Sequence, residues 1–260
     1  MIKAVDLNAD MGESFGPWTM GDDAALLDIV TSANIACGHH AGDWEVMAAT
    51  MRAAAMRGVG IGAHPGFPDI QSFGRKRMHF PLDSLGNLVR YQLGAAQAIA
   101  RANGSVVRHL KLHGALANMA SEDKAIARAC YEAALSVAPD LIVMVLAQTA
   151  QQEAAAELGC SAACKIFADR AYAEDATLLD RRQAGAVIHD PETAARRMVE
   201  MIRAGAIITQ GGKHITTRID TVCLHGDTPQ AVSIAQAVRD ALAEAGIAIT
   251  CFDGNPVSAA

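Results

Sequence analysis

Short apolar runs alternate with helix-like segments along the whole 260-residue chain, and this alternation limits the possible folds more than any other feature. The apolar runs have strand length, and the segments between them carry apolar residues at helical spacing. Seven or eight such units predict an α/β protein, a barrel of parallel strands in a single domain over residues 1–260. The expected strands are residues 2–8, 31–36, 59–62, 105–110, 141–146, 162–167, 221–224 and 247–252, and the expected helices are 21–30, 44–57, 83–103, 121–138, 147–158, 190–205 and 228–245.

Polar side chains gather where these expected strands end. Because active sites of parallel barrels lie at the carboxyl ends of the strands, we expect the clusters to meet at one mouth. The use of nearly every strand end favours a barrel over a doubly wound sheet, whose ligand site lies at a single switch point. The candidate site residues in these clusters are Asp6, Asn8, Asp10, Glu13, Asn34, His39, His64, Arg75, Lys111, His113, Asp169, Arg170, His225 and Asp227.

The segment SANIACGHHAGD, residues 32–43, holds two adjacent histidines. Adjacent side chains of an extended segment point in opposite directions, so at most one of the two should face a shared pocket. We expect His39 rather than His40 to do so. Asp43 stands directly before an expected helix and is suited to cap its free backbone N–H groups.

Three short patterns resemble known motifs but lack their context. Gly12–Gly16 matches GxSxG, yet Pro17 follows at once and no helix starts at Ser14, as a nucleophile elbow requires. The GxGxxA spacing at residues 58–63 follows a helix and precedes a proline-rich loop, which is the reverse of a dinucleotide fingerprint. The QGGK segment near Gly212 lacks the first glycine of a phosphate-binding loop.

Composition narrows the classes of partner. A net charge of −6 without a run of Lys or Arg argues against nucleic acid and anionic membranes as partners, and favours small molecules or proteins. No apolar run approaches a membrane span, and the N-terminus does not resemble a signal peptide, so we expect a cytoplasmic protein. The six cysteines have the spacing of isolated, reduced thiols.

The candidate residues are equipped for acid and base chemistry. Carboxylates and histidines transfer protons, while Lys and Arg stabilise a developing oxyanion, as hydrolysis of an amide requires. A divalent metal is a second option, with Asp10, His39 and His64 as candidate ligands, although no HExxH motif is present. For each histidine alone, a hydrogen-bonded structural role stays open.

Six segments in order resemble the LamB/YcsF family of 5-oxoprolinase A subunits. They are DLNADMGESFG, SANIACGHHAGD, GAHPGFPDIQSFGR, KLHGALAN, FADRAY and VCLHGD, and together they span nearly the whole chain. The resemblance implies a β/α barrel of the glycoside hydrolase/deacetylase type. It also implies ATP-dependent opening of 5-oxoproline to glutamate, carried out together with partner subunits B and C. Because no phosphate-binding loop is present, we expect the partners to handle ATP.

The resemblance assigns roles only as hypotheses. The acid, base and carbonyl-polarising residues would be Asp10, Glu13, His39, His64, Lys111 and His113, with Arg75 or Arg170 holding the substrate carboxylate. Two alternatives remain: a stand-alone metal-dependent deacetylase or carbohydrate hydrolase, and a non-catalytic ligand-binding protein.

The chain departs from the family pattern at five positions. Leu112 and Ala117 replace a proline and a tyrosine, Cys164 and Lys165 replace an Arg-Glu pair, and Ala184 replaces a proline. These changes leave the candidate site residues in place, but they are compatible with an altered substrate or partner surface.

Overall fold

The computed structural model describes residue 2 and residues 4–258, and its central element is a closed barrel of seven parallel strands. Neighbouring strands pair in chain order from β1 to β6, β6 pairs with β9, and β9 pairs back to β1. The predicted parallel barrel is therefore confirmed. The barrel strands are β1 (Ala4–Met11), β2 (Ser32–Ala36), β3 (Gly60–His64), β4 (Val107–Lys111), β5 (Ile142–Leu146), β6 (Ala162–Phe167) and β9 (Thr221–Leu224).

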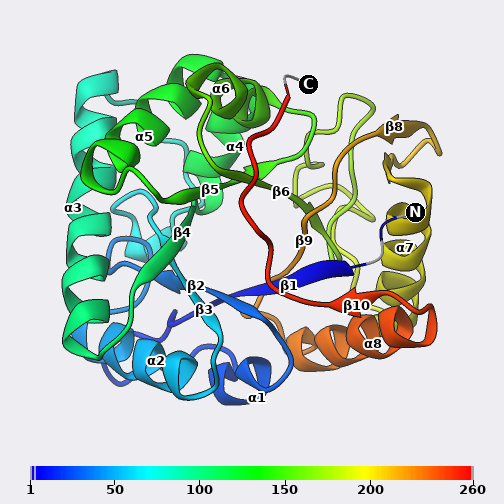
Figure 1. Ribbon diagram of the computed structural model, residues 1–260, viewed down its shortest axis with the longest axis horizontal. Helices are drawn as coiled ribbons and strands as arrows, with labels where there is room; N and C mark the ends of the chain where they lie inside the picture. Colours follow the sequence, from blue (N-terminus) through cyan, green and yellow to red (C-terminus); the bar gives the residue numbers. More distant parts are fainter. Residues whose placement is uncertain (1, 3, 259–260) are drawn as a thin grey trace.

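Helices surround the barrel on its outer side (Figure 1). The longest, α3, buries Leu85, Val89 and Leu93, which lie four residues apart along one face, and each such burial stabilises the fold by roughly 1.5–3 kcal/mol. Helix α3 packs against α5, and α7 packs against α8. The helices are α1 (Asp23–Leu27), α2 (Trp44–Met56), α3 (Leu82–Ala102), α4 (Gly114–Glu122), α5 (Lys124–Val137), α6 (Ala150–Leu158), α7 (Pro191–Ala204) and α8 (Ala231–Glu244), with a 3₁₀ turn η1 (Ile70–Ser72).

Helix boundaries follow the local sequence signals. The Asp43 carboxylate accepts hydrogen bonds from the backbone N–H groups of Glu45 and Val46 at 2.9 Å each, which confirms its role as the N-cap of α2. Asp190 caps α7, and Pro191 occupies the first turn of that helix. Among the described residues, none of the helices combines the length and apolar character needed to cross a membrane.

Several element boundaries differ from the expectation. Strand β1 continues to Met11 rather than ending at Asn8, because the alternation of polar and apolar residues persists through the polar cluster. Its expected start at Ile2 includes residue 3, which lies outside the described residues. Helix α4 begins already at Gly114, within the segment expected to be a loop. The expected last strand shrinks to β10 (Ala248–Ile249), which pairs with β1 outside the barrel. The antiparallel pair β7 (Ala206–Ile208) and β8 (His214–Thr216) was not predicted.

Asp6 lies deep in the barrel rather than at its mouth. Its carboxylate accepts hydrogen bonds from the hydroxyls of Thr31 and Ser32 at 2.7 Å each, and from Thr221. Burial raises the pKa of Asp6 despite these hydrogen bonds. The expectation that Asp6 lies at the mouth is therefore wrong: it stands four residues before Asp10 on the same strand, roughly 13 Å further from the mouth.

Asn8 and Asn34 form the layer above Asp6. The Asn34 amide donates to Oδ1 of Asn8 at 2.7 Å and to Oδ1 of Asp10 at 2.9 Å, and its own oxygen faces Nε2 of His109 at 2.9 Å. Both asparagines are completely buried. Contrary to expectation, neither residue lines the cavity at the mouth; with these internal partners, Asn8 and Asn34 support the mouth residues from inside the barrel.

The C-terminal segment closes the end of the barrel at which the strands begin; it crosses in front of the strands in Figure 1 (red). Phe252 from this segment packs against Ile142, Met144 and Ala163. Its ring also contacts His109 edge-on, with centroids 5.4 Å apart. Access to the polar interior is therefore from the opposite end, where the strands finish.

Candidate active site

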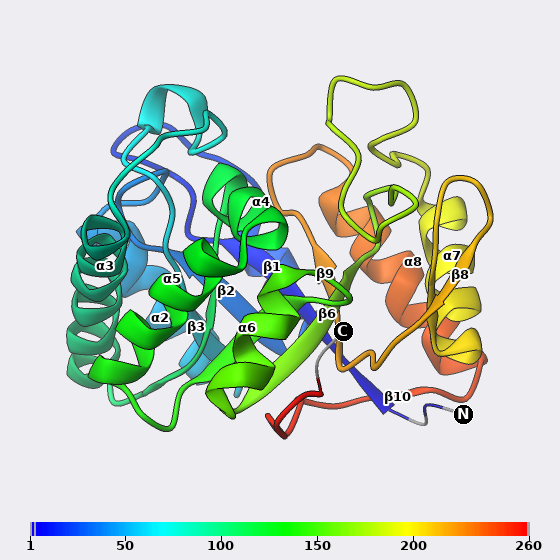
Figure 2. The same ribbon diagram turned by 90° about the horizontal axis from the view of Figure 1, so that it is seen from above.

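Two long loops rise on either side of the strand ends, residues 65–81 after β3 and residues 168–190 after β6 (cyan and yellow-green in Figure 2). Between these loops and the strand ends is a cavity of about 600 Å³. Its lining combines residues predicted from the sequence with several that were not. These lining residues include Asp10, Arg75, Lys111, His113, Arg181 and His225.

Asp10 and Lys111 form a buried ion pair at the floor of the cavity. Nζ of Lys111 lies 2.6 Å from Oδ1 of Asp10, and both residues are 2% exposed. Burial opposes both charges, but His64 and Lys111 hold the pKa of Asp10 well below its usual value, and Asp10 raises the pKa of Lys111. Lys111 therefore keeps a positive charge at a position where it can meet a developing oxyanion.

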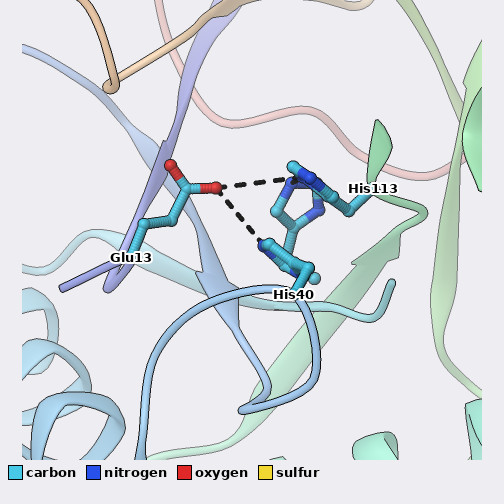
Figure 3. Close-up of side chains that lie close together, drawn as sticks. Glu13, His40 and His113 are labelled. Carbon is cyan, nitrogen blue, oxygen red and sulfur yellow. Dashed lines mark hydrogen bonds and ion pairs between the residues drawn. The ribbon is translucent and has the colours of Figure 1, made fainter. Parts of the chain in front are cut away.

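Beside this pair, four buried residues converge: Glu13, His40, His64 and His113. Each offers a ligand atom, and these atoms all lie within 4.8 Å of one another, so the cluster could bind a metal. Figure 3 shows the Glu13 carboxylate facing both His40 and His113, from which Oε1 is 3.3 Å and 3.9 Å distant. The rings of His40 and His113 stack with centroids 3.6 Å apart.

Burial and neighbouring charges shift the pKa of every group in this cluster. Burial, together with the carboxylates of Asp10 and Asp227, raises the pKa of Glu13 well above its usual value. Burial also lowers the pKa of His64, His40 and His113, and the last two are lowered well below the usual range. The three imidazoles are therefore neutral at pH 7.

Two glycines allow the 65–81 loop to press against the stacked imidazoles. A Cβ at Gly66 would lie 2.8 Å from Nδ1 of His40, and a Cβ at Gly74 would lie 2.7 Å from Cβ of the same residue. Gly74 also has a φ of +63°, a conformation that favours glycine. The buried amide of Gln92 holds the loop by hydrogen bonds to both the N–H and the C=O of Gly66.

His40, and not His39, belongs to this cluster. The ring of His39 stacks instead on Tyr91 of α3, with centroids 5.4 Å apart, and is only half-buried. The expectation that His39 faces the pocket is wrong, because β2 ends at Ala36 and the following residues bend rather than continue extended. Of the three predicted metal ligands, only His64 lies in the four-residue cluster; Asp10 is adjacent, with Oδ2 3.3 Å from Nε2 of His64.

His225 also lines the cavity, and it is paired with the buried Asp169. Nδ1 of His225 lies 2.7 Å from Oδ2 of Asp169, so the imidazole donates this N–H to the carboxylate. The neutral ring then has its acceptor at Nε2. His225 also stacks on Phe167 at 5.1 Å, which fixes the ring plane.

Arginines supply positive charge around the cavity. Arg75 pairs with Asp227 at 2.6 Å. Arg170, a predicted carboxylate ligand, donates to the backbone carbonyls of Ala186 and Leu179, so much of its hydrogen bonding stabilises its own loop. Arg181 lines the same cavity and makes no ion pair among the described residues. No sequence pattern indicated Arg181, because it lies in an irregular loop.

Lys165 is a second residue that the candidate set omitted. It projects from β6 and is 2% exposed, and no carboxylate lies within ion-pair distance of its ammonium among the described residues. Its Nζ lies 5.6 Å from the centre of the Phe167 ring, the same distance as Nζ of Lys111. Burial and the nearby Lys111 charge lower the pKa of Lys165 to about 7.

Comparison with known proteins assigns the relationship. The model of the LamB/YcsF family matches residues 5–256. The 5-oxoprolinase A subunit from Ruegeria pomeroyi is 66% identical, with 97% of this chain and 100% of that protein aligned. The 5-oxoprolinase A subunit from Nitrobacter hamburgensis is 51% identical over 95% and 98% of the two chains.

Solved structures agree with the barrel. A lactam utilization protein from Thermus thermophilus superimposes with a TM-score of 0.89 and 40% identity, covering 96% of this chain and 100% of that one. A more distant match, a T48 deacetylase with substrate, has a TM-score of 0.51 and 14% identity over 100% of this chain and 96% of that one, which shows a shared fold only.

Proposed function

Because the chain belongs to the LamB/YcsF family, we propose that it is the A subunit of an ATP-dependent 5-oxoprolinase, which opens the lactam of 5-oxoproline to give glutamate. Relatives that are named as 5-oxoprolinase A subunits align over nearly their whole length, which supports this assignment. The structural observation that carries the proposal is one cavity lined by a lysine, by arginines and by a histidine that is paired with a buried aspartate.

We assign the use of ATP to partner subunits B and C. The five-membered lactam is a resonance-stabilised amide with little ring strain, so coupling to ATP can drive its opening. The sequence of this chain lacks a phosphate-binding loop. This chain would then supply the site where the ring is bound and opened.

Arg181 is the residue we assign to the substrate carboxylate. It is the cavity arginine that makes neither an ion pair nor a loop-stabilising hydrogen bond among the described residues, whereas Arg75 is paired with Asp227. A guanidinium and a carboxylate form a charge-assisted, often bidentate, hydrogen-bonded pair. This contact would fix the orientation of the ring in the cavity.

Lys111 is placed to polarise the lactam carbonyl. Its ammonium is held by Asp10 at the cavity floor, so it is preorganised and does not need to move as charge develops on the carbonyl oxygen. Asp10 acts through Lys111, as the group that positions it and keeps it protonated.

His225 is the proposed general base. Once the B and C subunits have activated the ring at the expense of ATP, a water oxygen would attack the carbonyl carbon while Nε2 of His225 takes one of its protons, with Asp169 stabilising the resulting imidazolium. The same proton would then pass to the ring nitrogen as the C–N bond breaks. The products are a free amino group and a new carboxylate, as in glutamate.

Reconstitution tests this proposal. The purified chain, mixed with B and C subunits from the same source, should convert 5-oxoproline to glutamate only when ATP is present. His225→Asn should lower kcat by roughly 10²–10⁴-fold, the usual contribution of a general base, while exposed His189→Asn should not change it. Full activity without this chain would contradict the proposal.

A further inference from the structure

We propose that Glu13, His40, His64 and His113 bind a first-row divalent transition metal, with Zn²⁺ as the ion that fits best. All four side chains are at least 95% buried, and they come from different parts of the chain. The placement of the hydrogen atoms on the imidazoles, which does not depend on the substrate, points to such an ion.

The hydrogen bond to a backbone carbonyl fixes the tautomer of His64. Nδ1 of His64 lies 2.7 Å from the carbonyl oxygen of Lys111. A carbonyl oxygen only accepts, so Nδ1 carries the hydrogen. In the neutral ring, Nε2 is then a lone pair, and it faces Nδ1 of His113 at 3.1 Å and Oδ2 of Asp10 at 3.3 Å.

A backbone carbonyl also fixes the tautomer of His113, but here the hydrogen is on Nε2 rather than on Nδ1. Its Nε2 lies 2.8 Å from the carbonyl oxygen of Phe73 and must donate, which leaves Nδ1 as the lone pair. That lone pair faces Nε2 of His64 and, at 3.9 Å, Oε1 of Glu13. The acceptor nitrogens of His64 and His113 therefore lie at hydrogen-bond distance from each other in a buried site, with no hydrogen between them. The carboxylates of Asp10 and Glu13 lie close to the same two nitrogens.

A metal ion resolves this conflict. Lone pairs that converge without a donor are unfavourable in a buried site, but they are the arrangement that a cation requires. The outward N–H groups bonded to backbone carbonyls are also typical of metal-binding histidines, whose orientation is set in this way.

The distances suit a small ion. Bonds of about 2.0–2.1 Å from zinc to nitrogen or oxygen place neighbouring tetrahedral ligands about 3.4 Å apart. The observed separations are 3.1 Å between His64 and His113, 3.3 Å between His40 and Glu13, and 3.9 Å between His113 and Glu13. Small side-chain adjustments would complete the geometry.

The donor types select the class of metal. Three imidazole nitrogens and one carboxylate oxygen favour zinc and related first-row ions over Mg²⁺ or Ca²⁺, which prefer oxygen ligands alone. His113 also lines the 600 Å³ cavity, so an ion bound here would lie at its wall. There it would supply Lewis-acid polarisation of a carbonyl or an activated water.

The experiment measures binding of the metal alone. Protein stripped with a chelator is titrated with Zn²⁺ by calorimetry and with Co²⁺ by visible absorption, which reports the coordination geometry. We expect one ion per chain and a visible band with nitrogen coordination. Glu13→Gln and His113→Asn should each weaken affinity at least about 100-fold, while exposed His189→Asn should match the wild type.

The outcomes separate this site from the proposed function, because no readout uses turnover. Loss of binding counts only if the variants keep the wild-type circular dichroism spectrum. Absence of stoichiometric Zn²⁺ binding would overturn the proposal, as would equal affinity in the wild type and both ligand variants. A shared proton on His64 would then explain the close approach of the imidazoles.

Discussion

Lys165→Met is expected to stabilise the protein, and most strongly at low pH. Lys165 is a buried ammonium without a carboxylate partner among the described residues, and burial lowers its pKa to about 7. An unfolded lysine titrates near 10.4. Between these values the unfolded chain binds more protons than the folded one, so the stability of the wild type rises with pH across this window. Below about pH 7 the destabilisation is complete.

The magnitude follows from the two pKa values. The full difference corresponds to up to about 5 kcal/mol of destabilisation below pH 7. Integrating the difference in bound protons between the unfolded and folded chains from pH 7 to pH 9 raises the unfolding free energy of the wild type by about 2 kcal/mol. Methionine is unbranched and flexible, so it can fill the space of the lysine stem without burying a charge.

Denaturant unfolding of both proteins at pH 6, 7, 8 and 9 provides the measurement. The variant should be the more stable at every pH, and the gap in unfolding free energy should shrink by about 2 kcal/mol from pH 7 to pH 9. All other titrating groups are common to both proteins and cancel in the comparison. Lys124→Met, at an exposed surface position, should show no such pH dependence. A pH-independent gap, or a less stable Lys165→Met, would refute the reasoning.

Three further predictions address the cap, the cavity and the loop. Asp43→Ala removes the N-cap of α2 and should cost about 1 kcal/mol, measured as a fall of roughly 2–4 °C in Tm; an unchanged Tm would contradict the role of this cap. Arg181→Gln should raise the KM for 5-oxoproline by roughly 10–100-fold with little change in kcat, whereas exposed Arg128→Gln should leave both constants alone; an unaltered KM would exclude Arg181 from substrate binding. Gly74→Ala should destabilise the protein more than Gly104→Ala, because both have a left-handed φ but only Gly74 packs against the stacked imidazoles; equal unfolding free energies would mean that this packing contributes nothing.

The alternation of strands and helices was sufficient to predict the barrel and its mouth. Asp10, His64, Lys111 and His113 lie at or just after the ends of β1, β3 and β4, and because parallel strands finish at one edge of the barrel, these residues meet. Depth within the barrel was harder to predict. The inward face of β1 extends over several layers, so Asp6 shares the orientation of Asp10 but lies far below it.

Other site residues escaped prediction for identifiable reasons. The choice of His39 over His40 assumed an extended chain, but Gly38 and Gly42 adopt positive φ and turn the segment between them. Arg181 lies in an irregular loop whose path no periodicity encodes. Lys165 occupies an inward position of β6 where an apolar residue is expected, so only the three-dimensional structure reveals that its charge is buried with no carboxylate partner among residues 4–258.

We propose that this chain opens the lactam at the cavity floor, beside Lys111. The most direct test is the rate of glutamate formation from 5-oxoproline and ATP by the complete A, B and C assembly containing Lys111→Met. Because this change removes the ammonium partner of the buried Asp10 carboxylate, the double variant Asp10→Asn/Lys111→Met serves as a second test, in which position 10 carries no charge.

We predict that both variants assemble with the partner subunits but lose roughly 10²–10³-fold in kcat, the usual cost of removing an oxyanion donor. Lys124→Met should retain the wild-type rate. Wild-type turnover by an assembly containing Lys111→Met would contradict the account, because it would exclude Lys111 from stabilising the oxyanion.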